Sequence, residues 1–199
     1  MNFIDNILNR ITMYRLVLYY LAVLIVAAFV FGLLGIMPYD PTALAFSTAL
    51  ILLVCYATNW LFARVFEAQT NVESVYITAL ILVLIVNPVT AADHAGVGFL
   101  MFASVWASAS KYLFAIGKKH IFNPAAFAVA LTARAINRSA TWWVGGSAVL
   151  LPIVVIGGLL VVRKIRRFDL FLSFAAVSLA TIALTSNSAS YITPVVQTL

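Results

Sequence analysis

Long apolar runs separated by short polar stretches dominate the chain. The first, 16–36, reads LVLYYLAVLIVAAFVFGLLGI, and the second covers 42–63. Each is long enough to cross a bilayer, which takes about 20 predominantly apolar residues. Three further predicted spans lie at 95–116, 147–162 and 170–185. The pattern predicts an all-α integral membrane protein.

Two other apolar segments are shorter and sharply bounded. VYITALILVLIVNP is preceded by Thr70–Glu73, which has the spacing of a capping box, and ends at Asn87-Pro88. The second, 121–136, contains Asn123-Pro124, an N-cap residue followed by proline at the first helical position. Such segments predict half-spanning helices, whose ends must be buried in protein or line a cavity. Two ordinary tilted helices with firm caps explain the pattern equally well.

Counting the short segments, we predict about seven transmembrane or half-spanning helices with the N-terminus in the cytoplasm. This layout follows the positive-inside rule. The basic residues on the cytoplasmic side are then Arg10, Arg15, Arg64, Lys118, Lys119 and the RKIRR stretch at 163–167. Only Arg134 and Arg138 fall on the outer side.

The predicted organisation has three parts. Residues 1–15 form an amphipathic interfacial helix, because Phe3, Ile7 and Ile11 share one helical face. Residues 16–185 form the transmembrane domain. The segment 186–199 reads as a turn and the start of a further helix, so we expect the chain to continue or to be truncated.

Composition supports a membrane protein and narrows its chemistry. Of 199 residues, 64% are hydrophobic and 9% are charged, too few polar residues to cover a soluble domain. The net charge is +6, and the basic residues lie between the apolar runs. This placement indicates contact with membrane lipid and not with nucleic acid. A single cysteine, Cys55, excludes an intramolecular disulfide, and two isolated histidines give no metal-site spacing.

Lys111 is the most informative single residue. A charge within an apolar span is costly and usually marks function. Ser104 and Ser108 precede it at helical spacing, so the three form one narrow polar face. We therefore take Lys111 and Ser108 as candidate site residues. In the alternative interpretation, Lys111 only extends its side chain to the cytoplasmic interface.

Three more candidates border or occupy the short segments. Asn71 and Thr78 belong to the first segment, and Asn123 begins the second. Free N–H groups at a helix N-terminus favour anionic ligands, so these residues are candidate binding residues. Alternatively, Asn71 and Asn123 act only as helix caps.

Two stretches together resemble a known family. NVESVYITALILVLIVNP (71–88) and SASKYLFAIGKKHIFNPAAFAVAL (108–131) are similar to the membrane proteins of the NqrB/RnfD family. Its members belong to the sodium-pumping NADH:quinone reductase and to the Rnf electron-transport complex. Ser110-Lys111 and Phe122-Asn123-Pro124 carry the resemblance most specifically. It covers roughly 70–185, about half of the family fold.

The resemblance implies one repeat of a urea-transporter-like fold in the bacterial plasma (inner) membrane. It also implies a flavin in the membrane domain, FMN or riboflavin. No match to the family's covalent attachment motif is present, because NRSATWW (137–143) lacks its glycine. We therefore expect non-covalent binding, and interpret 137–143 as an interfacial loop with an aromatic belt, Trp142 and Trp143.

Three functions compete. The leading one is a membrane-embedded electron-transfer module of a flavin-dependent oxidoreductase. It would pass electrons between a reductase partner, either another subunit or a fused domain, and an acceptor such as a quinone, and ion translocation could accompany this transfer. The alternative is a channel or transporter half for a small solute. The third is a structural subunit that anchors a soluble partner.

Overall fold

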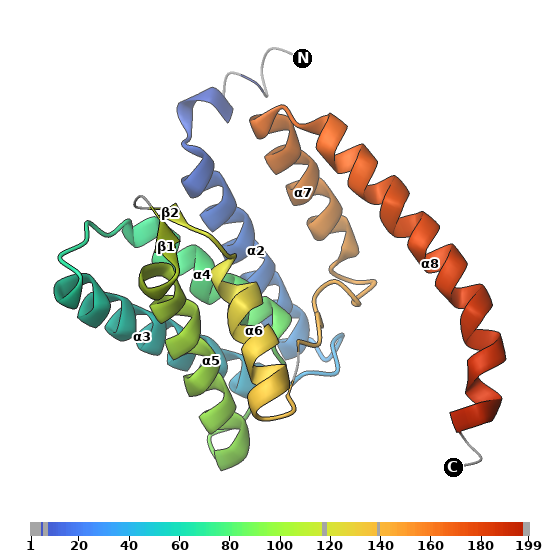
Figure 1. Cartoon of the computed structure of the whole chain (residues 1–199), viewed down its shortest axis with the longest axis horizontal. Helices are drawn as coiled ribbons and strands as arrows, with labels where there is room; N and C mark the ends of the chain where they lie inside the picture. The colour runs from blue at the N-terminus through green and yellow to red at the C-terminus, as the bar shows by residue number, and fades with distance from the viewer. Residues whose placement is uncertain (1–4, 6–7, 117–118, 139, 197–199) are drawn as a thin grey trace. The chain divides into compact units, whose positions relative to one another are not determined.

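The computed structural model describes residues 5, 8–116, 119–138 and 140–196, and they are mostly helical (Figure 1). The chain divides into two compact units, Met1–Gly157 and Gly158–Leu199. Of the interfacial helix predicted over 1–15, residues 1–4 and 6–7 lie outside the described residues; 8–10 are helical, and the helix is interrupted at Ile11 and Thr12. The first long helix, α2, begins at Met13, because the Thr12 hydroxyl accepts a hydrogen bond from Arg15 N and caps it.

From Met13 onwards, the described residues of the first unit form five complete helices, a short hairpin and the start of a further helix. The complete helices are α2 (Met13–Leu33), α3 (Pro41–Val65), α4 (Val72–Ile85), α5 (His94–Leu113) and α6 (Pro124–Ala135). The hairpin pairs β1 (Ala115–Ile116) with β2 (Lys119–His120), and α7 (Leu151–Ile165) begins in this unit.

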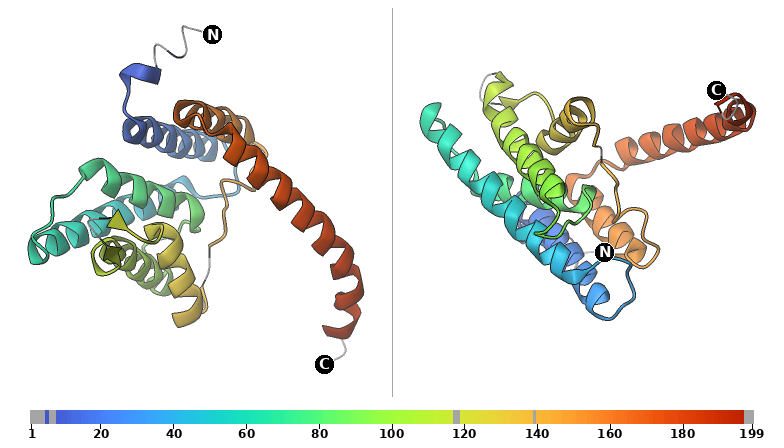
Figure 2. Two further views of the ribbon diagram at one scale, coloured as in Figure 1. Left: turned by 45° about the horizontal axis from the view of Figure 1, so that its top comes forward. Right: turned by 90° about the horizontal axis from the view of Figure 1, so that it is seen from below.

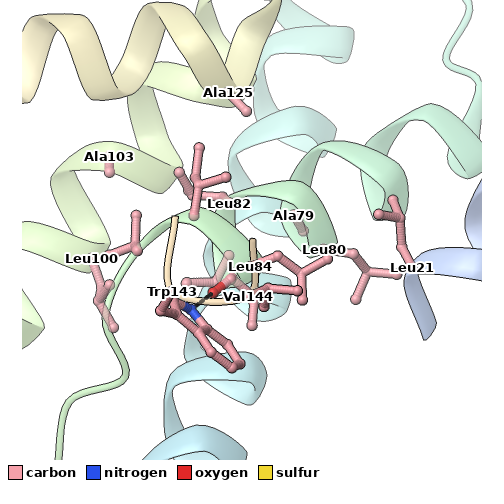
Figure 3. Close-up of a cluster of buried hydrophobic side chains, with 14 of the residues drawn as sticks. Leu21, Ala79, Leu80, Leu82, Leu84, Leu100, Ala103, Ala125, Trp143 and Val144 are labelled. Carbon is pink, nitrogen blue, oxygen red and sulfur yellow. Dashed lines mark hydrogen bonds between the residues drawn. The ribbon is translucent and has the colours of Figure 1, made fainter. Parts of the chain in front are cut away.

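Helix α4 forms the centre of the first unit. It is apolar around its whole circumference, and Ala79, Leu82 and Val83 are at most 1% exposed. A short helix of this kind is stable only when neighbours cover every side. Helices α2, α3, α5 and α6 all contact it. Figure 3 shows Leu82 and Leu84 of α4 among buried side chains that include Leu21 of α2, Leu100 of α5 and Ala125 of α6.

Residues 140–144 close the C-terminal end of α4. The backbone N–H groups of Thr141 and Trp142 donate to Ile85 O at 2.8 and 3.2 Å. The indole N–H of Trp143 donates to Val83 O at 3.0 Å, and its ring lies 5.0 Å from that of Tyr39. These donors satisfy carbonyls that a helix end leaves free. The predicted aromatic belt is therefore wrong for Trp143, which is 5% exposed, while Trp142 is 62% exposed.

Helices α3 and α5 run side by side, as the views in Figure 2 show. Small residues on α5 allow this close approach, among them Ala103 and Ala107, which are fully buried. Ser108 Oγ donates to Cys55 O at 3.1 Å, and Cys55 Sγ lies 3.6 Å from Ser104 O. The two serines of the predicted polar face are thus turned towards α3, whereas Lys111 contacts α4.

The sequence predicts a span to residue 116, but α5 ends at Leu113. The next residues form the β1–β2 hairpin, with Ala115 opposite His120. The apolar pattern continues through Phe114 and Ile116, and so it conceals the end of the helix. This hairpin is a small departure from the predicted all-α fold.

Within the described part of the chain, three helical segments are long and apolar enough to cross a membrane: Met13–Leu33, Pro41–Val65 and Phe168–Thr185. Helices α4 and α6 are shorter, with 14 and 12 residues, as the sequence predicts. Helix α5 has 20 residues but is less apolar, because its serines and Lys111 interrupt it. Seven crossings and a cytoplasmic N-terminus stay predictions.

Helix α7 begins against α2. Tyr20 of α2 donates its hydroxyl hydrogen to Val154 O at 3.2 Å. Gly157 lies against the Tyr20 ring so closely that a Cβ there would clash with it. Glycine is therefore required at this contact between the two helices.

The second unit contains the remainder of α7 and helix α8 (Phe168–Val196). Arg166 has a φ of 54° and ends α7 in the left-handed region. Helix α8 continues through 186–196, where the sequence predicts a turn and a further helix. Over 168–185 its large apolar side chains are exposed, including Phe174 at 73% and Leu179 at 68%, which suits contact with lipid.

Candidate functional site

A cleft of about 950 Å³ lies at the N-terminal end of α4. Its walls come from the N-terminal end of α2, the C-terminal ends of α3 and α5, and the hairpin. The polar side chains that line it include Asn59, Asn71, Ser74, Lys111, Tyr112 and His120. Its volume is within the range of small-molecule sites in proteins.

Lys111 joins the last turn of α5 to the first turns of α4. Its ammonium group donates to Ser74 O at 2.9 Å and lies 3.4 Å from Ser74 Oγ. The side chain is half-buried and lines the cleft. Among the described residues, no carboxylate lies within ion-pair distance of it. The cation is therefore held by neutral oxygens, and a third N–H group is left for a ligand.

Three of the predicted site residues meet at Ser74. Asn71 Oδ1 accepts a hydrogen bond from Ser74 N at 3.4 Å and caps α4. Thr78 Oγ1 donates to Ser74 O at 2.9 Å, the same carbonyl that Lys111 contacts. Ser74 itself was not among the predicted site residues. Its position four residues before Thr78 places both on one helical face, and this was the available signal.

The start of α4 differs by one residue from the predicted capping box. Asn71, not Thr70, is the N-cap. Glu73 instead accepts a hydrogen bond from Arg15 Nε at 2.9 Å and links α4 to α2. Both side chains are partly exposed, at 30% and 59%, so this ion pair contributes little to stability. Its importance is that it occupies the only carboxylate in the first turn of α4.

The other predicted site residues make contacts within the fold. Ser108 is 1% exposed and bonded to Cys55 O, and Thr78 is 5% exposed. Asn123 accepts hydrogen bonds from Ala125 N and Ala126 N at 3.1 and 3.3 Å and so caps α6. Of the five candidates, only Lys111 and Asn71 line the cleft.

Aromatic and amide side chains also line the cleft. The Tyr112 hydroxyl donates to Asn59 Oδ1 at 2.8 Å. The rings of Phe66 and Tyr112 are stacked with centroids 6.0 Å apart. Asn59 and Tyr112 come from α3 and α5, and sequence spacing alone could not bring them together. The cleft thus combines a cation, amides and flat apolar rings with one carboxylate, Glu67, which is not within ion-pair distance of Lys111.

Over the residues that the structure describes, no group of three His, Cys, Asp or Glu side chains could hold a metal ion. No family model, curated protein or solved structure matches this chain. The resemblance to the NqrB/RnfD family therefore stays a prediction, and the interpretation of the cleft depends on its own geometry.

Proposed function

We propose that this chain is a membrane-embedded electron-transfer module that binds a flavin, FMN or riboflavin, without a covalent bond in the cleft around Lys111. One observation carries the proposal: a half-buried ammonium group lines a ligand-sized cleft and has no carboxylate partner among the described residues. A cation held in this way favours a ligand with negative charge.

The residues present fit a flavin. A flat aromatic ligand matches the stacked rings of Phe66 and Tyr112. Asn71 uses its side-chain oxygen for the cap and keeps its amide N–H groups for a ligand. The cleft therefore offers a surface for a ring, donors for its polar edge and a cation for its charge.

When bound, a flavin supplies the electron-transfer chemistry, and the protein supplies position and electrostatics. In the proposal, Lys111 stabilises negative charge on the ring or on a phosphate. Asn71 orients the polar edge, and Tyr112 covers one face. Ser108, Thr78 and Asn123 act indirectly, because their hydrogen bonds fix the helices that carry the cleft.

The wider setting belongs to the proposal as well. We place the chain in the bacterial plasma membrane with several crossings and a cytoplasmic N-terminus, as a member of the NqrB/RnfD family. The electron donor would be a reductase subunit or domain, and the acceptor a membrane compound such as a quinone. Two features support this placement: the three helices of membrane-spanning length and the pair of short, capped helices, α4 and α6.

Flavin binding by the purified, detergent-solubilised chain tests the proposal. Quenching of flavin fluorescence on titration measures the affinity for FMN and riboflavin. We expect Lys111→Met to weaken binding about tenfold, which corresponds to about 1.4 kcal/mol. The bound flavin's reduction potential should also become more negative, by about 30 mV for the same change in a two-electron couple.

Arg134→Met is the matched control, because Arg134 is an exposed cation in the last turn of α6 and does not line the cleft. It should leave both values unchanged. Equal binding and potential in the parent and Lys111→Met would overturn the assignment of the cleft. A chain that binds no flavin but conducts a small solute in liposomes would instead support the transporter function. A chain that does neither would support the structural anchor.

A further inference from the structure

A second site lies on the outer face of α3, where Arg64 stacks on Trp60. The guanidinium carbon is 3.9 Å from the centre of the Trp60 ring. Both side chains are exposed, Trp60 by 48%. Among the described residues, no carboxylate lies within ion-pair distance of Arg64. Stacking fixes the plane of the guanidinium group and leaves its N–H fork available to an acceptor outside the chain.

The nearby acidic side chains, Glu67 and Glu73, do not pair with Arg64. Glu73 is bonded to Arg15, and Glu67 lines the cleft around Lys111. The groove beside Arg64 has a volume of about 210 Å³ and no acidic side chain in its lining. Its positive charge comes from Arg64, and the Thr70 hydroxyl adds a donor. The groove therefore favours an anion.

An apolar track leads away from this groove along α3. Leu53, Tyr56, Trp60 and Arg64 follow one another at intervals of three or four residues and so share a helical face. Leu53 is 67% exposed and Tyr56 50%. Because α3 is long and apolar enough to span a membrane, its last turn lies near the membrane surface and Leu53 lies deeper. This face therefore presents a cation near the membrane surface and apolar side chains deeper in the membrane.

We propose that this face binds an anionic phospholipid. Arg64 and Thr70 hold the phosphodiester of the headgroup, and an acyl chain lies along Tyr56 and Leu53. Arginine binds phosphate through two parallel N–H bonds, and tryptophan is favoured at the level of the headgroups. The site is separate from the flavin proposal, because it does not use Lys111, although Asn59 and Thr70 line both cavities.

The experiment compares two lipids that differ only in the headgroup, which is anionic in one and zwitterionic in the other. The full chain in detergent is titrated with phosphatidylglycerol and phosphatidylcholine of identical acyl chains, and native mass spectrometry counts the bound lipid. We expect the parent to bind phosphatidylglycerol about fivefold more tightly, since one basic residue near a membrane surface contributes about 1 kcal/mol. Arg64→Met should lose this preference, and Arg134→Met, with its exposed cation on α6, should keep it.

Arg64 is exposed, so Arg64→Met should keep the helical content that circular dichroism measures in the parent. Arg64→Lys is a second variant that keeps the charge but lacks the fork, and it should lose part of the preference. A parent without preference, or either variant with the full parental preference, overturns the proposal. Displacement of the lipid by an equal concentration of glycerol phosphate also overturns it, because the occupant would then be a soluble phosphate.

Discussion

The two ends of α4 meet opposite environments. At the C-terminal end, residues 141–143 donate hydrogen bonds to the carbonyls of Val83 and Ile85, and Trp143 is buried against Tyr39. At the N-terminal end, Asn71 and Ser74 line an open cleft. One end is sealed by the chain itself, and the other is accessible to a ligand.

This contrast predicts that the C-terminal end of α4 contributes mainly to stability and the N-terminal end mainly to ligand binding. The free backbone groups at a buried helix end need partners, and protein must supply them. The sealed end meets that need with buried contacts, so substitutions there should lower stability. The open end uses an N-cap and the ammonium group of Lys111, so substitutions there should affect a ligand more than the fold. Two variants at the sealed end test this division, and a third tests the N-cap of α3, next to Tyr39.

Trp143→Ala should have the largest effect. It removes a buried indole and its hydrogen bond to Val83 O, and we expect a loss of about 3 kcal/mol in the free energy of unfolding. Thermal unfolding in detergent, followed by circular dichroism, measures this. Trp142→Ala, at the exposed tryptophan immediately before it in the chain, should lower the free energy of unfolding far less.

Flavin affinity of Trp143→Ala, measured well below its unfolding temperature, should equal that of the parent. A variant of parental stability that had lost flavin binding would contradict the division between the two ends.

Thr141→Val should have an intermediate effect at the same end. The variant loses the hydrogen bond from Thr141 Oγ1 to Asn87 Oδ1 at 2.9 Å, and keeps the backbone donors to Ile85 O. A cost of about 1 kcal/mol is expected for one side-chain hydrogen bond. Thr181→Val is the control, because this exposed threonine bonds only within its own helix. Equal unfolding temperatures of the two variants would show that this contact does not stabilise the C-terminal end of α4.

The smallest expected effect depends on pH and concerns Asp40, which caps α3 next to Tyr39. The side-chain hydroxyl of Thr42, and then its backbone N–H, donate to this carboxylate and hold the pKa of Asp40 below its usual range. The stabilisation is therefore present above the unfolded pKa, about 3.9, and is lost as pH falls through the lower folded value.

Asp40→Asn keeps a capping side chain that does not titrate. Its unfolding temperature should fall less than that of the parent between about pH 5 and pH 3. Parallel curves for the two proteins over this range would exclude a contribution from the Asp40 carboxylate.

Local signals in the sequence predicted the short helices. Asn123-Pro124 marks the start of α6, and Asn87-Pro88 lies just beyond the end of α4, because caps and prolines act within a few residues. Lys111 is half-buried at a cleft, and its role as a site residue stays a prediction. The end of α5 was not predictable in this way, since an apolar hairpin strand looks like more helix.

The partners of the site were beyond sequence reasoning. Lys111 reaches Ser74 across 37 residues, and Trp143 reaches Val83 across 60. Both contacts depend on how helices pack, and periodicity within one helix does not encode that choice. Trp143 shows this most clearly, because a tryptophan beside a membrane span suits the interface equally well.

The seal at the end of α4 also has a consequence for the order of synthesis. Ile85 and the Thr141 that binds its carbonyl are 56 residues apart. While the ribosome is still adding the intervening helices, the end of α4 has none of these donors, and exposure of its carbonyls to hydrocarbon would be costly. We therefore expect α4 to settle into the membrane late, after α5 and α6 have been made, although it precedes them in the chain.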